Sequence, residues 1–230
     1  MRKYALAAFI CISLAFTANA QEGPKVINTE PQLSDIYAVF DVLNIHLFRF
    51  DLKEFLTDVY FVNLYIDEYE AGKEAKRVNT IRVDKNIVSL NDVPAEYRDE
   101  LRKQKNIPEG KNEWDHIKEI SLYITKPNDS TARFSINIPE AMRTNQQVKL
   151  RPVGAYRKTC FYQPVPFTFK AMEKQEVMKV PLLLYGSAWE DTKNGFIRFC
   201  GEREIDTDMK AELLSDMPHY YIIGLELKKE

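Results

Sequence analysis

The side chains best suited to chemistry are carboxylates beside the two tryptophans. Trp114 lies between two acids, and an acid pair follows Trp189 directly. The acids concerned are Glu113, Asp115, Glu190 and Asp191. Paired carboxylates are the working groups of glycosidases, and an aromatic ring beside acids is typical of sugar-binding sites. The pattern suggests glycan binding by Trp114 or Trp189. The alternative interpretation is that both tryptophans fill cores and the acids line solvated loops.

Other catalytic patterns are missing. His46, His116 and His219 are far apart in the sequence, whereas a zinc site normally has two ligands close together. We interpret them as surface or strand-end histidines. Gly186-Ser187-Ala188 lacks the second glycine of a nucleophile elbow, and with only 8 glycines a phosphate-binding loop is not found. We therefore expect no cofactor, no metal and no catalytic residue.

The N-terminus indicates export. Arg2 and Lys3 precede an apolar run from Tyr4 to Phe16, and Ala18-Asn19-Ala20 then matches a signal peptidase site. We predict a signal peptide at residues 1–20. The apolar run is shorter than the roughly 20 residues that span a bilayer, so we expect no transmembrane segment after cleavage. The predicted location is the periplasm or the cell surface of a Gram-negative bacterium.

The cysteines follow from this prediction. Cys11 leaves with the signal, and lipid attachment there is disfavoured because Ile10 is bulky where a small residue is needed. Cys160 and Cys200 remain, and an oxidising compartment favours a disulfide between them. It would close a loop of about 40 residues and contribute roughly 4 kcal/mol in the chain-entropy model. Their spacing is unlike the Cys-x-x-Cys of redox or metal sites.

Composition restricts the class of partner. Hydrophobic residues make up 45% of the chain and charged residues 29%, which is typical of a globular protein. The formal charge of -2 becomes -4 when Arg2 and Lys3 are removed. The basic stretch from Arg98 to Lys111 is interleaved with acids, as on a solvated helix face. We therefore expect no nucleic-acid partner.

Alternation with a period of two dominates the C-terminal half. Apolar residues alternate with polar ones in 119–125 and in 132–138. Folding these segments about Asp129 sets Ile124 opposite Phe134, Leu122 opposite Ile136 and Ile120 opposite Ile138. The loop between them contains Asp129-Ser130-Thr131, which resembles the O-glycosylation motif of exported Bacteroidetes proteins, with Ser130 as acceptor.

Further strands complete the predicted C-terminal domain. The segment 161–169 carries two prolines in register and predicts an edge strand, and Asn194-Gly195 predicts a type I′ hairpin. About seven strands follow Ile117. The fold class is therefore mainly β, with an antiparallel, immunoglobulin-like β-sandwich at 113–230.

The N-terminal part is less regular. Residues 21–34 are expected to be an extended leader, and 35–112 a smaller β-rich (α+β) region with one helix after Pro94. Segments 59–66 and 78–84 predict a second hairpin. Residues 36–50 fit either a helical face or a buried strand, and we favour a strand from about Asn44. Whether residues 21–112 form an independent domain is left open.

Several segments together resemble uncharacterised exported proteins of gut Bacteroides species. They are the signal ending Ala18-Asn19-Ala20 before Gln21, the strand end Tyr65–Tyr69 and the joint Asn106–Lys111. The resemblance covers the whole chain. It implies export and a domain of unknown function, and it brings no activity or ligand.

Three functional hypotheses follow. The first is an envelope protein that binds or scaffolds a protein or glycan partner without catalysis. The second is a glycan-active hydrolase with carboxylates near Trp114 or Trp189. The third is a subunit that adds a strand to the sheet edge of a partner.

Overall fold

The computed structural model describes residues 26, 28–154, 159–171, 173–199 and 205–230. The strands are β1 (Ile45–Asp51), β2 (Tyr60–Glu70), β3 (Lys76–Lys85), β4 (Ile87–Ser89), β5 (Glu113–Asp115), β6 (Glu119–Asn128), β7 (Thr131–Ile138), β8 (Met142–Lys149), β9 (Thr159–Pro166), β10 (Val177–Asp191), β11 (Phe196–Arg198) and β12 (His219–Lys229). The helices are α1 (Leu33–Val42), α2 (Ala95–Gln104) and α3 (Glu212–Asp216), with short 3-10 turns η1 (Lys53–Phe55) and η2 (Leu90–Asp92).

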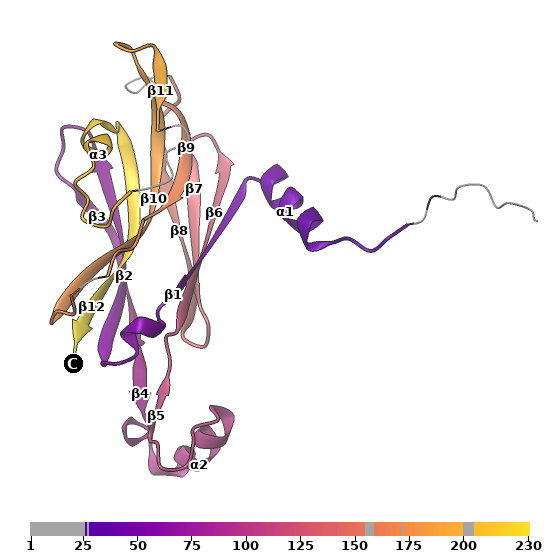
Figure 1. Cartoon of the computed structure of the whole chain (residues 1–230), viewed down its shortest axis with the longest axis vertical. Coiled ribbons are helices and arrows are strands. Elements are labelled where there is room, and N and C mark those ends of the chain that lie inside the picture. Colours follow the sequence, from indigo (N-terminus) through magenta and orange to yellow (C-terminus); the bar gives the residue numbers. More distant parts are fainter. Residues whose placement is uncertain (1–25, 27, 155–158, 172, 200–204) are drawn as a thin grey trace, which may run out of the picture.

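The strands form two main sheets that face each other (Figure 1). The four-stranded sheet has the order β1-β6-β7-β8; the six-stranded sheet has the order β11-β10-β12-β2-β3, with β9 also paired to β10. The larger of two hydrophobic clusters takes side chains from both sheets, and Phe134 of β7 packs edge-to-face on Tyr185 of β10 at 5.5 Å. The expectation of a mainly antiparallel β protein is confirmed.

The β6–β7 hairpin has the predicted register. Ile124 pairs with Phe134 and Leu122 with Ile136, and all four side chains are buried. The prediction succeeded because strict alternation allows only one register that keeps every apolar side chain on the same face.

Strands from both predicted regions enter the same sheets. β1 pairs with β6, and β2 pairs with β12 along eleven residue pairs. Val62, Leu64 and Ile66 of β2 are buried in the shared core, and β2 is an inner strand with β3 on one side and β12 on the other. The range 35–112 thus contributes to the same two sheets as the range 113–230.

Residues 36–50, whose pattern fits either a helix or a strand, contain the end of a helix followed by a strand. α1 spans Leu33–Val42, so the predicted leader ends in the first helical residues, and β1 begins at Ile45, next to the predicted start at Asn44. Asn44 has a positive φ of 53°, which ends the helix and turns the chain into the strand.

Two local predictions differ in outcome. β9 pairs only with β10 among the described strands, which agrees with an edge strand carrying prolines. The type I′ turn at Asn194-Gly195 is wrong, because Gly195 has a positive φ of 73° and Asn194 does not. The Asp191 carboxylate instead accepts bonds from the backbone N–H groups of Lys193 and Asn194, which stabilises a longer loop.

Candidate functional site

A pocket of about 680 Å³ opens between the edges of the two sheets. Its apolar lining comes from β1 and η1 on one side, the segment after β9 on the other, and β10 below. These residues are Phe50, Leu52, Phe55, Phe169, Ala171, Val180 and Leu182. We call this the edge pocket. Its volume lies within the range of roughly 300–1,000 Å³ typical of binding pockets.

The edge pocket exists because β9 is shorter than β10. β9 pairs with β10 only from Leu183 to Trp189. Among the described strands, none covers the preceding part of β10 on that side, so Val180 and Leu182 form the floor of a hollow. β1 is the edge strand of the opposite sheet and forms the other wall.

Charged groups stand around this apolar lining. Arg49, Lys170 and Lys174 line the pocket together with Asp51 and Glu54. Arg49 pairs with Glu119, Lys170 with Asp206 at 2.5 Å, and Lys174 with Asp58 at 3.0 Å. Hydrogen bonds from Lys229 and Lys174 lower the pKa of Asp58 to about 2. The mouth thus combines fixed charges with an apolar interior.

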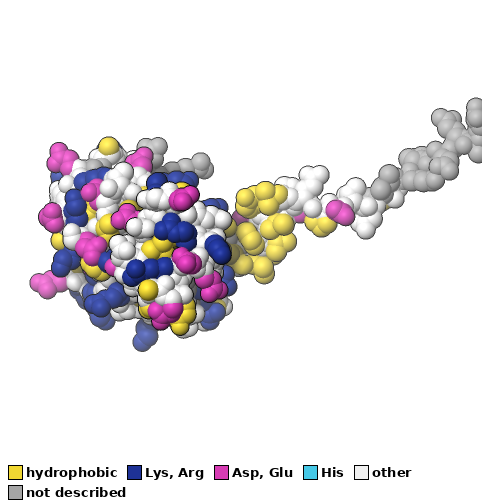
Figure 2. All heavy atoms as spheres, turned by 90° about the horizontal axis from the view of Figure 1, so that it is seen from below, with side chains coloured by type: hydrophobic (Ala, Val, Ile, Leu, Met, Phe, Trp, Pro, Cys, Tyr) yellow, Lys and Arg dark blue, Asp and Glu magenta, His cyan; other side chains and the backbone are white. Residues whose placement is uncertain are grey.

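Helix α1 stands apart from the body of the protein and is hydrophobic (Figure 2). Seven of its ten residues are apolar and none is buried. The most exposed are Val42 at 86% and Leu33 at 65%, and Tyr37 is 55% exposed. A helix that is apolar on most faces is normally buried against a partner.

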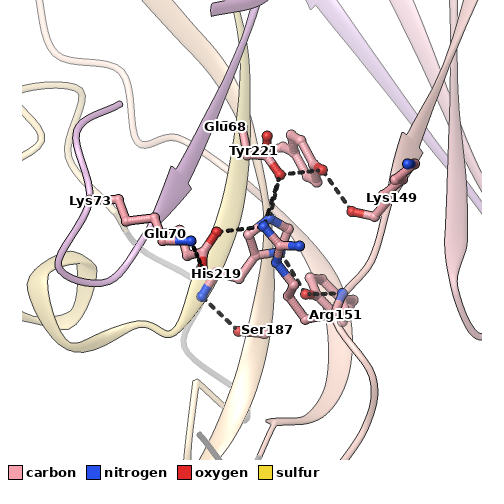
Figure 3. A network of polar contacts seen from close by, with 9 residues as sticks. Glu68, Glu70, Lys73, Lys149, Arg151, Ser187, His219 and Tyr221 are labelled. Carbon is pink, nitrogen blue, oxygen red and sulfur yellow. Dashed lines mark hydrogen bonds and ion pairs between the residues drawn. The ribbon is translucent and has the colours of Figure 1, made fainter. Parts of the chain in front are cut away.

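A buried polar network joins β12 to β2, β9 and the end of β8 (Figure 3). His219 Nδ1 lies 2.6 Å from the Tyr162 hydroxyl, and His219 Nε2 lies 3.0 Å from Glu68 Oε1. The Tyr221 hydroxyl lies 3.0 Å from the same Glu68 oxygen and 2.7 Å from the Lys149 carbonyl oxygen, so it shares its one hydrogen between them. Because Lys149 belongs to the four-stranded sheet, the network ties the two sheets together.

The surrounding bonds decide the tautomer of His219. The Glu68 carboxylate can only accept, so the hydrogen of the neutral imidazole lies on Nε2 and is donated to Glu68. Nδ1 is then the acceptor, and the Tyr162 O–H donates to it while the Tyr162 oxygen accepts from the Arg151 backbone N–H. Burial lowers the pKa of His219 and outweighs the opposite effect of Glu68. Burial raises the pKa of Glu68, but the bonds from His219 and Tyr221 reverse this and lower it. A neutral imidazole therefore faces a charged carboxylate.

This network was not expected from the sequence. The sequence predicts a surface or strand-end residue at His219, and His219 is indeed the first residue of β12, but its side chain is completely buried. It cannot contact a substrate in this conformation. The almost continuously apolar sequence of β12 does indicate a buried strand, but the partners Glu68 and Tyr162 lie 151 and 57 residues away from His219.

The two tryptophans lie on β5 and β10, and β5 and β11 mark opposite ends of the molecule (Figure 1). Trp189 is 8% exposed and packs in a core cluster. The Arg198 guanidinium lies 5.8 Å from its ring centre, and a pocket of about 360 Å³ lies beside it. A hydrogen bond from Asn194 lowers the pKa of Asp191.

Trp114 lies on β5 opposite Val88 and is partly buried. Its ring packs edge-to-face with His116 at 6.4 Å. Among the described residues, no hydrogen-bond partner meets its buried Nε1. The structure does not bring Trp114 and Trp189 together.

The remaining predicted positions lie on loops and edges. Ser130 is exposed, and its hydroxyl donates to Asn128 Oδ1 at 2.9 Å. Its modification stays a prediction. Cys160 lies on β9, whereas Cys200 lies outside the described residues, so their disulfide also stays a prediction. Gln163 of β9 donates to the carbonyl of Phe199 at 2.7 Å, which brings the residue before Cys200 close to the strand of Cys160.

Two features are absent from the described residues. None of their helices is long and apolar enough to cross a membrane. No group of three His, Cys, Asp or Glu side chains among them is arranged to hold a metal ion.

The fold and site define a mainly antiparallel β protein in which an apolar pocket lies between two sheet edges. A family model for a domain of unknown function, DUF5041, matches residues 15–229, and the chain belongs to this family. Searches of curated proteins and of solved structures found no match.

Proposed function

We propose that this protein is an exported, non-enzymatic binding module that holds an apolar segment of a protein partner in the edge pocket. The edge pocket supports this proposal, because it combines apolar walls with charged groups at its mouth. The signal peptide predicted at residues 1–20 and the resemblance to exported Bacteroides proteins support a site of action in the periplasm or at the cell surface.

The chemistry of the edge pocket favours a protein over a glycan. Three phenylalanines and three aliphatic side chains are among its lining residues. Such a lining suits leucine-like and aromatic side chains that a partner presents from a helix or strand. Because two packed antiparallel sheets are also the plan of immunoglobulin-like domains, we propose that relationship for this fold.

The hydrolase hypothesis is the alternative, and it depends on the acids near Trp114 or Trp189. A general acid in a glycosidase needs a raised pKa. The pKa of Asp191 is lowered instead, so Asp191 does not suit the role of the general acid at Trp189.

Photo-crosslinking in the producing cell tests the proposal. A benzophenone amino acid replaces Phe169, which is 46% exposed at the edge pocket, or Tyr97, which is 58% exposed on α2 and serves as the matched control. We expect a protein adduct that forms from position 169, is absent from position 97 and disappears with Ala171→Trp, which fills the pocket. Equal adducts from both positions, or none from position 169, would overturn the proposal.

A further inference from the structure

We propose that the outer face of the six-stranded sheet binds a small ligand that carries a carboxylate or phosphate group. The site is a hollow of about 400 Å³ over the neighbouring strands β12, β2 and β3 (Figure 1). Its polar and aromatic lining residues are Phe61, Asn63, Arg82, Asp84 and Lys228. We call it the outer-face site. None of the described residues that line it also lines the edge pocket, so the inference goes beyond the proposed function.

The two cations of the outer-face site have no partner within the described residues. Arg82 and Lys228 are exposed, and neither forms an ion pair or a side-chain hydrogen bond there. Other cations of the same sheet face are neutralised, because Arg77, Lys85 and Lys179 each pair with a carboxylate. Arg82 and Lys228 therefore keep their charge for an anion that arrives from solution.

A β-bulge separates Arg82 from the nearest acid in its own strand. In a regular strand Arg82 and Asp84 would share one face and could form an ion pair. The pairing of β2 with β3 shifts register here, and Arg82 lies opposite Asn63 on the outer face. Asp84 lies opposite Val62, which is buried in the core. The Asp84 carboxylate is thus turned away from Arg82 and lies 3.7 Å from His116 Nε2. Bulges re-aim side chains in this way beside functional sites.

Arg82 and Lys228 stand on either side of the same part of β2. Lys228 of β12 pairs with Phe61, the residue two positions before Asn63. The strands β12 and β3 are about 10 Å apart, since neighbouring strands are spaced about 4.8 Å. Two long side chains can close this distance over one oxyanion. The Arg82 guanidinium can hold it through two parallel bonds, and the Lys228 ammonium adds a point charge.

The rest of the lining suits a ligand with a ring-shaped body. The Asn63 side-chain amide has no hydrogen-bond partner within the described residues, so it can donate to and accept from a ligand. The Phe61 ring is 42% exposed and offers an apolar surface beside the charges. A sugar acid or a sugar phosphate combines an oxyanion, hydroxyl groups and a ring that packs on an aromatic side chain.

The test is calorimetric titration of the full chain, expressed with residues 1–20 so that the producing cell can process it. The probes are glucuronate, which carries a carboxylate, the phosphate ester of glucose, and glucose, which carries neither group. We expect saturable binding of at least one anionic probe with a Kd of about 1 mM or below, and none of glucose. The anionic probe that binds identifies the recognised group. NMR should show a shift of the Arg82 Nε–H and none of the Arg133 Nε–H.

Matched variants locate the site. Arg82→Gln should weaken binding at least about tenfold, because it removes the bidentate donor, and Lys228→Gln should weaken it as well. Arg133→Gln on β7 is the matched control, since Arg133 is also exposed and unpaired within the described residues but lies in the other sheet. Ala171→Trp, which fills the edge pocket, should bind like the unsubstituted chain.

Three results would overturn the inference. The first is no saturable binding of either anionic probe at about 10 mM, ten times the expected upper limit of Kd. The second is binding by Arg82→Gln at full strength. The third is an equal loss in Arg82→Gln and Arg133→Gln with both variants folded by circular dichroism, which would show only a diffuse attraction to surface charge.

Discussion

Phe50 of β1 and Phe169 of the segment after β9 pack edge-to-face, with their ring centres 5.9 Å apart. This pair links the edges of the two sheets at the wall of the edge pocket. Phe50 is 9% exposed and belongs to the core, whereas Phe169 is 46% exposed. Phe50 therefore contributes to the core, whereas Phe169 is accessible to a partner.

The two phenylalanines should differ in their effect on stability. Phe50→Ala leaves a cavity in the core and is expected to lower the free energy of unfolding by about 3–5 kcal/mol. Phe169→Ala removes mainly the ring pair and should lower it by about 0.5–1.5 kcal/mol. Urea unfolding followed by circular dichroism measures both. If both variants lost the same free energy of unfolding, Phe50 and Phe169 would not differ in their contribution to the core.

Gly224 of β12 should not tolerate a side chain. A Cβ at this position would lie 2.5 Å from the ring of Tyr65 on β2, which covers the glycine. Gly224→Ala is expected to destabilise the protein by about 1–3 kcal/mol, because the buried ring must move. Thermal unfolding measures the loss. An unchanged midpoint would mean that Tyr65 does not pack over this backbone.

Because the pKa of the buried His219 is lowered, we expect the protein to lose stability in mild acid. The neutral form of His219 contributes stability that is fully present above about pH 6.5. That contribution is lost as the pH falls through the folded pKa. The maximum slope is about 1.4 kcal/mol per pH unit for one proton.

The variant His219→Gln should flatten this part of the profile. The pKa of Glu68 is also lowered. Its charged form therefore contributes stability that is present above about pH 4.5 and is lost at lower pH. Urea unfolding at a series of pH values measures the slope. If His219→Gln kept the full slope between pH 6.5 and 5, the neutral imidazole would not be its source.

The disulfide between Cys160 and Cys200 is tested by mass spectrometry. We expect the exported chain to resist alkylation until it is reduced, and reduction to lower the free energy of unfolding by roughly 4 kcal/mol. Cys160→Ser should give the same loss, with no further loss on reduction. Alkylation of both thiols in the unreduced chain would show that no bond is formed.

Local patterns made much of the fold predictable, and long-range pairing did not. The β6–β7 register follows from alternation around a short loop. The pairing of β2 with β12 joins residues more than 150 positions apart, for example Glu68 with Tyr221, and nothing in either strand marks its partner. Many apolar strands can pair with one another, so burial decides the choice only when the whole sheet is assembled.

The candidate site could not be predicted from the sequence for the same reason. The edge pocket is built from residues within 49–55, 169–171 and 180–182 together with Lys174, and no motif connects them. The apolar residues of α1 were visible in the sequence as a helical face, but their exposure was not, because periodicity predicts a buried face and cannot show that the partner surface is missing.

The most direct test of the central claim is whether the protein adduct expected from position 169 depends on the edge pocket itself. Ala171→Trp and Tyr97→Trp are the matched variants, because both positions are exposed and only Ala171 lines the pocket. We predict that the adduct disappears with Ala171→Trp and stays with Tyr97→Trp. An adduct that persists at full yield in Ala171→Trp would contradict the account.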